Sequence, residues 1–142
     1  MNRIFVYGTL KSEKVQRELF GKVLKKAPAR LENYALFEAE DGWYFVREEK
    51  GKSVEGFIIE MDDDDLKICD AFEYYPEMYQ KRPVEVVTGE KKVEAYIYVR
   101  VDDVGRYKEI KNFNAYSRLN EDEFINTEVK KFKEVEHPEF YR

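Results

Sequence analysis

A series of six strand-like stretches, separated by short turns, constrains the fold of this 142-residue chain most strongly. Apolar residues recur through residues 3–7, 29–39, 43–46, 53–61, 78–88 and 92–101, and each stretch has strand-like length or alternation. Turn signals lie at Asp41-Gly42, at Lys50-Gly51-Lys52 and around Gly89. Many strands joined by hairpin turns, with few helices, predict an α+β fold whose sheet closes toward a small barrel.

Two residues inside these stretches carry positional information. Pro83 has no backbone N–H to donate to a neighbouring strand, so it predicts an edge strand or a bulge. Gly56 predicts either a bulge or the close approach of another backbone segment.

Two helices are predicted in the first half of the chain. The first covers residues 12–21, where apolar residues recur near helical spacing and Gly21 can end the helix. The second begins at the four aspartates of residues 62–65 and ends before Pro76. Consecutive acids on a helix point in different directions, so helix capping explains this run better than a metal cluster does.

A third, amphipathic helix is predicted over residues 120–135. Ile125, Val129 and Phe132 fall on its inner side, with Phe124 at the margin. We expect this stripe to pack on the sheet or on a partner subunit, because it is too apolar to remain in water.

Composition excludes several classes of function. The formal net charge is −5, so no basic field favours general nucleic-acid binding. Cys69 and His137 are the only residues of their types, which argues against a disulfide, a histidine-rich metal site and a catalytic triad. The chain start lacks a signal peptide, and no apolar run reaches membrane-spanning length. We expect a cytoplasmic protein in which a carboxylate, a tyrosine or backbone groups carry any chemistry.

The stretch FVYGTL, residues 5–10, breaks the first strand at Gly8 just ahead of the first helix. One interpretation is an ordinary strand end. The other is that the N–H groups of Gly8, Thr9 and Leu10 converge on one point, because exposed N–H groups ahead of a helix bind anions and oxyanions.

Asp70 and Glu73 lie three residues apart near the end of the second helix and share one of its faces. Both are candidates for solvated surface acids. Glu73 differs because it is predicted at the negative end of the helix dipole, among Phe72, Tyr74 and Tyr75. The negative end of the dipole disfavours ionisation, and the aromatic side chains shield the carboxylate from water. Both effects raise the pKa of a carboxylate toward that of a useful general base. Asp70 is expected to be the less consequential surface acid.

Taken in order, these motifs resemble the gamma-glutamyl cyclotransferase-like family, which includes the gamma-glutamylamine cyclotransferases. The N-terminal signature of that family, a strand followed by Tyr-Gly-Ser/Thr-Leu, corresponds to Tyr7-Gly8-Thr9-Leu10. Further correspondences are ARLENYALF at residues 29–37, the stretch at 54–66, the acidic helix end at 70–73 followed by YQKRPVEV at 79–86, and AYIY at 95–98.

The resemblance implies a small mixed β-barrel with flanking helices. It makes Glu73 the catalytic acid/base and Tyr7, Gly8, Thr9 and Leu10 the substrate-binding loop. The implied reaction is intramolecular aminolysis of a γ-glutamyl amine or amino acid, which releases 5-oxoproline and needs no metal or cofactor. On this reading residues 1–142 form a single domain whose C-terminal helical extension, from about residue 112, has no identified counterpart.

The sequence allows two alternative functions. The same fold could serve as a small-molecule binding or interaction module without turnover, since fold alone does not fix function. The enzyme could also act on another acyl or amide compound. The sequence leaves open the leaving amine, and it leaves open whether the chain forms a homodimer.

Overall fold

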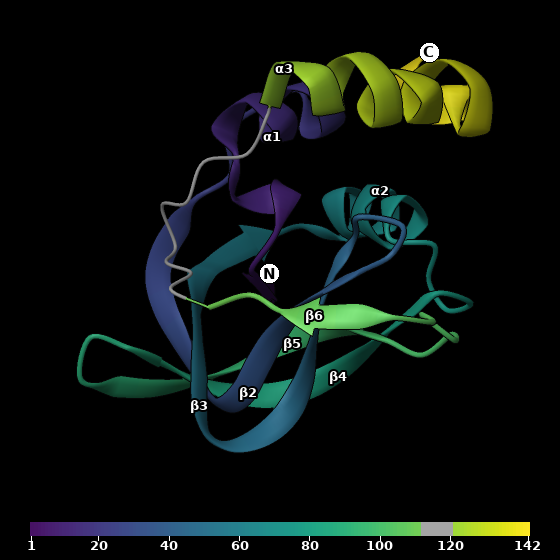
Figure 1. Cartoon of the computed structure of the whole chain (residues 1–142). Coiled ribbons are helices and arrows are strands. Elements are labelled where there is room, and N and C mark those ends of the chain that lie inside the picture. Colours follow the sequence, from purple (N-terminus) through teal and green to yellow (C-terminus); the bar gives the residue numbers. More distant parts are fainter. Residues whose placement is uncertain (112–120) are drawn as a thin grey trace.

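The computed structural model describes residues 1–111 and 121–142, and a closed barrel of five strands lies at its centre (Figure 1). The strands are β1 (Asn2–Val6), β2 (Lys26–Ala39), β3 (Tyr44–Met61), β4 (Tyr79–Thr88) and β5 (Lys91–Arg100). They follow the order β3-β1-β5-β4-β2, and β2 pairs back with β3 to close the ring. β1 and β5 are parallel, whereas the other pairs are antiparallel. The predicted α+β fold, a small mixed barrel with flanking helices, is confirmed.

Alternate residues of β1 serve two different buried clusters, as the period of a strand requires. Ile4 and Val6 belong to a cluster that also includes residues of the flanking helices. Phe5 and Tyr7 belong to a second cluster, in which all the buried members come from the strands or the ends of the strands. The end of β1 is therefore fixed from both sides, and this rigid end is where the chain enters the FVYGTL turn.

The prediction of two strands at residues 43–46 and 53–61 was wrong, because β3 is continuous through both. The turn signal at Gly51 is an irregularity inside the β2–β3 ladder, where the register shifts between Glu32 and Tyr34. Gly51 has φ 87°, and its N–H donates to Asn33 Oδ1 at 3.1 Å. The glycine bends the long strand without ending it. A further short strand, β6 (Tyr107–Glu109), pairs with the end of β2 and was not predicted.

Gly56 and Pro83 both occupy positions that suit them. A Cβ atom on Gly56 would lie 2.2 Å from the Val6 carbonyl oxygen, so the predicted close approach of backbone is confirmed. Pro83 pairs with Tyr96 in an unbroken β4–β5 register, so no bulge forms there. The opposite side of β4 pairs with β2 through a single residue pair, Arg30 with Val87, which leaves Pro83 on an edge-like side of the strand.

Two short helices flank the barrel near its N-terminal strand, and both carry the expected caps. α1 (Glu13–Phe20) begins at Ser12, whose Oγ accepts from the Val15 N–H at 3.2 Å, and ends at Gly21 with φ 73°. α2 (Asp63–Phe72) begins at Asp62, whose carboxylate accepts from the Asp65 N–H at 2.7 Å. The aspartate run therefore caps α2, as predicted.

Replacing Ser12 by alanine is expected to lower the free energy of unfolding by about 1 kcal/mol, because the variant loses the N-cap acceptor of α1. The Ser12 hydroxyl also donates to Glu121 at the start of the C-terminal helix, so the variant should lose a stabilising contact of that helix as well. Urea denaturation measures the change. Ser12→Asn, which retains a capping acceptor, is the matched control, and a Ser12→Ala protein as stable as wild type would contradict the assignment.

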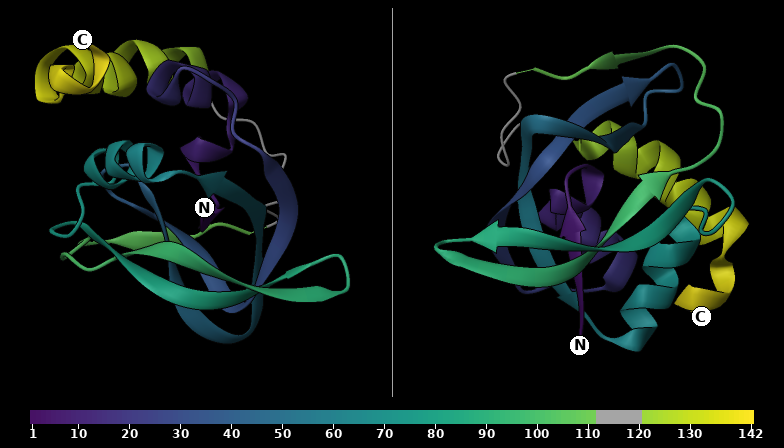
Figure 2. Two further views of the ribbon diagram at one scale, coloured as in Figure 1. Left: turned by 180° about the vertical axis from the view of Figure 1, so that it is seen from behind. Right: turned by 90° about the horizontal axis from the view of Figure 1, so that it is seen from below.

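The C-terminal helix, defined here as residues 121–136, runs through α3 (Glu121–Phe124) and the π-helical segments η2 (Ile125–Val129) and η3 (Phe132–Glu136). A final turn, η4 (Pro138–Tyr141), follows it. Figures 1 and 2 show this helix beside α1, above one end of the barrel. The position Asn120, where the sequence predicts its start, lies outside the described residues.

The apolar stripe of the C-terminal helix packs within the same chain. Val129 and Phe132 are fully buried, and Phe124 and Ile125 are half-buried. The Phe132 ring lies 5.3 Å from that of Phe72 in α2, and the Tyr141 hydroxyl donates to the Leu19 carbonyl of α1 at 2.8 Å. The stripe thus covers the flanking helices of its own chain. The homodimer, the single-domain organisation and an extension beginning at about residue 112 stay predictions.

Candidate functional site

A cavity of about 540 Å³ opens where β1 ends, between the barrel and the C-terminal helix. Four parts of the chain supply its polar and aromatic walls: residues 7–10, the β2–β3 hairpin at 41–44, the corner after α2 at Glu73, and the C-terminal helix. Its volume lies within the range typical of small-molecule sites. Tyr7, Gly8, Thr9, Leu10 and Glu73, the five residues singled out from the sequence, all line it.

The loop after β1 carries backbone N–H groups that have no backbone partner among the described residues, and the residues that carry them line this cavity. Residues Thr9–Lys11 form a 3₁₀ turn in which the Gly8 and Thr9 carbonyls accept from Lys11 and Ser12, each at 3.1 Å. Within the described part of the chain, the N–H groups of Gly8, Thr9 and Leu10 donate to no backbone carbonyl. A Cβ atom on Gly8 would meet no protein atom within 4 Å, so glycine keeps this side of the loop open.

Tyr7 has a structural position within this loop. Its side chain is buried, and its hydroxyl donates to the Tyr98 carbonyl of β5 at 2.7 Å. Burial raises the pKa of Tyr7 well above its ordinary value, so the hydroxyl stays protonated. This hydrogen bond ties the start of the loop to the neighbouring strand.

Glu73 occupies the C-cap of α2, where a Schellman motif ends the helix. The Tyr74 N–H donates to the Ala71 carbonyl at 3.1 Å, and the Tyr75 N–H donates to the Asp70 carbonyl at 3.0 Å. This motif requires a left-handed residue at Tyr74, which has φ 52° although it is not glycine. The reversal of the chain at Tyr74 directs Glu73 toward the cavity.

The Glu73 carboxyl group lies in an environment that disfavours its charged form. Burial, with the negative charge of Asp70 as a second cause, raises its pKa to about 7. The residue as a whole is half-buried because its side chain faces the cavity. Its carboxylate accepts no hydrogen bond from the described residues, so nothing there offsets the cost of removing the charge from water.

The expectation that Asp70 is a solvated surface acid was wrong. Its carboxylate accepts from the Tyr98 hydroxyl at 2.5 Å and from Lys81 Nζ at 2.9 Å, and its side chain is about three-quarters buried. β4 and β5 supply these two partners, which sequence spacing on α2 could not reveal. Asp70 is a fixed negative charge one helical turn before Glu73.

Replacing Asp70 by asparagine is expected to move the acidic limb of the pH–activity profile to lower pH. Loss of the negative charge lowers the pKa of Glu73, and Lys81, left without its partner, acts in the same direction. The shift should stop short of the ordinary glutamate range, because burial is the larger cause and is unchanged. A profile of kcat/KM against pH measures it. Lys81→Met should move the limb oppositely, and two unchanged profiles would contradict the coupling.

The β2–β3 hairpin forms another wall, which the sequence marked only as a turn. The Arg100 side chain is 4% exposed, and it donates to the two Asp41 carboxylate oxygens at 3.0 and 2.6 Å. The Trp43 ring lies 6.0 Å from Phe124 and 6.3 Å from Phe72, in edge-on contacts. The turn of the hairpin is therefore held at two points, by the ion pair of Asp41 and by the ring contacts of Trp43.

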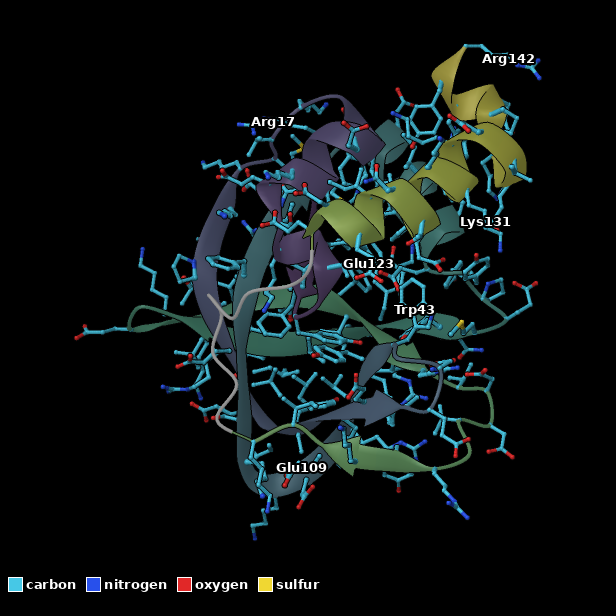
Figure 3. The ribbon with its side chains drawn as sticks, turned by 45° about the horizontal axis from the view of Figure 1, so that its top comes forward. Arg17, Trp43, Glu109, Glu123, Lys131 and Arg142 are labelled. Carbon is cyan, nitrogen blue, oxygen red and sulfur yellow. The ribbon has the colours of Figure 1, made fainter. Side chains whose placement is uncertain are left out.

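The C-terminal helix supplies the last wall through Glu123, Phe124, Thr127 and Glu128. Figure 3 shows Glu123 on the helix and Trp43 on the hairpin, which face the same region of the molecule. The sequence placed Phe124 at the margin of the apolar stripe, but it gave none of these four residues a role in a site. Tyr79 and Tyr98 also line the cavity, and neither was assigned a role from the sequence.

The described residues contain no group of three or more histidine, cysteine, aspartate or glutamate side chains arranged to hold a metal ion. None of the helices in the described ranges is both long enough and apolar enough to cross a membrane. The chemistry available in the cavity is that of one carboxyl group with a raised pKa, a set of backbone N–H donors and aromatic walls.

Comparison with known proteins places these features in a family context. Residues 4–118 match the family described as "Gamma-glutamyl cyclotransferase, AIG2-like". A protein of Methanocaldococcus jannaschii named "Putative gamma-glutamylcyclotransferase" is 28% identical over 120 residues, which cover 82% of this chain and 98% of the relative.

Solved structures extend the comparison. The crystal structure of an AIG2-like protein of Mus musculus is 30% identical with a TM-score of 0.57, over 70% of this chain and 76% of that one. A structure named "Gamma-glutamyl cyclotransferase" has a TM-score of 0.62 at 18% identity, over 76% of this chain and 69% of that one. At that identity, the second likeness concerns the fold alone.

Proposed function

Because the chain belongs to the gamma-glutamyl cyclotransferase, AIG2-like family, we propose that it converts a γ-glutamyl amine or γ-glutamyl amino acid into 5-oxoproline and the released amine. The observation that carries the proposal is the position of Glu73. A carboxyl group with a pKa of about 7 lines the same cavity as the N–H groups of residues 8–10. A site for intramolecular aminolysis needs these two components.

The reaction joins two groups of one substrate molecule. The α-amine nitrogen of the glutamyl group attacks its own γ-carbonyl carbon, a C–N bond forms, and a five-membered ring closes. The bond from that carbon to the leaving nitrogen then breaks. Since the reacting groups are already tethered, the cavity mainly has to hold the folded conformer and exclude extended ones. The rigid walls around residues 7–10 and Trp43 suit this role.

Glu73 would move the proton that the reaction releases. The attacking amine is neutral when it reacts and becomes cationic as the bond forms, so its proton passes to the Glu73 carboxylate. The protonated carboxyl group then donates to the leaving nitrogen, which departs as a neutral amine. A pKa of about 7 suits both steps, because the group is a competent base and a competent acid near neutral pH.

The N–H groups of Gly8, Thr9 and Leu10 would stabilise negative charge during this sequence. They either hold the oxyanion that develops on the γ-carbonyl oxygen or bind the substrate α-carboxylate. Tyr7 acts indirectly, because its hydroxyl is bonded to Tyr98 and positions the loop. On this proposal the strand breaks at Gly8 in order to direct these donors into the cavity.

The experiment that tests the proposal is an assay for 5-oxoproline with a panel of γ-glutamyl amines and γ-glutamyl amino acids. Turnover of at least one member supports the enzyme. Binding without turnover, with Glu73 intact, would favour the alternative of a binding module on the same fold. If the protein neither bound nor converted any member of the panel, the γ-glutamyl assignment would fail. Another acyl or amide compound would then be the candidate substrate.

A further inference from the structure

The cavity walls carry charge of one sign. Five acidic residues line it: Glu38, Asp41, Glu73, Glu123 and Glu128. No lysine, arginine or histidine occurs among the described residues that line it. Away from the N–H groups of residues 8–10, a site with this lining favours cationic groups of a ligand and disfavours anionic ones.

The acids differ in how far their charge is offset by neighbouring cations. Asp41 lies 2.6 Å from Arg100, and Glu38 lies 3.5 Å from Lys108. Glu128 is half-buried and forms no ion pair within the described part of the chain. Glu123 is more exposed than Glu128, and a charge held away from water acts more strongly on a ligand. Glu128, which lines the same cavity as Glu73, is therefore the wall acid best suited to bind a ligand cation.

The position of the C-terminal helix indicates which part of the substrate would meet this charge. On the proposed function, the reacting half of a γ-glutamyl compound would occupy the space between residues 8–10 and Glu73. The leaving group would then meet the remaining wall, which includes Trp43, Phe124 and Glu128. The aromatic rings add to the preference, because tryptophan and phenylalanine faces attract ammonium groups.

We propose that the leaving group is an amine carrying a second positive charge, as in a γ-glutamyl diamine or polyamine, and that Glu128 of the C-terminal helix selects it. This inference rests on the proposed function and deepens it by naming the substrate class. The selecting residue lies in the C-terminal helix, outside residues 4–118, which match the family. An amino acid leaving group would bring a carboxylate toward Glu128 and be disfavoured.

A charge series of three substrates of similar size tests the inference. The compounds are γ-glutamyl-1,4-diaminobutane, γ-glutamylpentylamine and γ-glutamyl-4-aminobutanoate, whose far ends are cationic, neutral and anionic. Wild type should show the highest kcat/KM for the cationic compound, about 10-fold above the neutral one, as is typical of a charged hydrogen bond. Glu128→Gln should remove most of that advantage, and Glu128→Lys should shift the preference toward the anionic compound.

Glu134→Gln is the matched control, because Glu134 is an exposed acid on the same helix and does not line the cavity. Equal kcat/KM values across the series, or an unchanged ratio in Glu128→Gln, would overturn the inference while 5-oxoproline release still supported the proposed function. If wild type released no 5-oxoproline from any compound, the proposed function would fail. Calorimetric affinities for the same three compounds would then decide the charge preference.

Discussion

Replacing Glu73 by glutamine is expected to lower turnover to 5-oxoproline by about 10²-fold or more, the range usual for the loss of an acid/base group. Glutamine keeps the size and hydrogen-bonding shape of the side chain but cannot accept the proton. Binding of a γ-glutamyl compound should persist, because residues 7–10 and the aromatic walls are unchanged. Steady-state kinetics with detection of 5-oxoproline, and calorimetry with the same compound, measure the two quantities separately.

Glu77→Gln is the matched control, since Glu77 is an exposed glutamate in the same corner and does not line the cavity. It should retain wild-type turnover. A Glu73→Gln protein as active as wild type would show that another group accepts the proton.

The free energy of unfolding of wild type and of Glu73→Gln, measured as a function of pH, shows whether the variant remains folded. The folded-state pKa of Glu73, about 7, lies above its ordinary value of 4.5. Between these values the native state binds more protons than the unfolded state, so this group makes stability fall as pH rises through the window. Glu73→Gln removes that dependence. The variant should therefore be at least as stable as wild type above pH 7, and the difference should disappear below pH 4.5.

Replacing Gly56 by alanine is expected to lower the free energy of unfolding by about 3 kcal/mol or more, the upper part of the range for overpacking. The added Cβ would lie 2.2 Å from the Val6 carbonyl oxygen and 2.9 Å from the Phe5 ring. The oxygen belongs to the backbone, so relief requires β1 and β3 to move apart. Denaturant unfolding measures the loss.

Ser53→Ala, at an exposed position on the same strand, is the control and should change stability by less than about 0.5 kcal/mol. Since Val6 directly precedes the loop, Gly56→Ala should also weaken substrate binding in whatever fraction remains folded. A Gly56→Ala protein with unchanged stability would mean that the two strands adjust without cost.

Local signals in the sequence predicted the parts of the fold that local chemistry controls. The end of α1 at Gly21, the cap at Asp62 and the end of α2 before Pro76 follow from local backbone needs that a few neighbouring residues satisfy. The turn signal at Gly51 was misread, since a glycine with positive φ serves a bend inside a ladder as well as it serves a hairpin. Only the pairing of β2 with β3 distinguishes the two.

The site was predictable to the extent that it consists of short motifs. Residues 7–10 and Glu73 each stand out within a few positions, and the fold brings them to one cavity. The environment of Asp70 was not predictable, because Tyr98 and Lys81 reach it from two other strands. The helical wall with Glu128 was missed for the same reason, since its role depends on where a distant helix packs.

The two neighbours of Glu73 in the chain are both attached to the C-terminal helix. The Phe72 ring contacts Phe132 at 5.3 Å, and the Tyr74 hydroxyl donates to the Glu136 carboxylate at 2.9 Å. A local opening of that helix would release the corner that carries the carboxyl group at the same time as it exposed the cavity. On the proposed function, substitutions at Phe132 or Glu136 should therefore alter reaction rate and substrate choice together. A change of substrate preference that loosens the packing of this helix would then also change the rate of turnover.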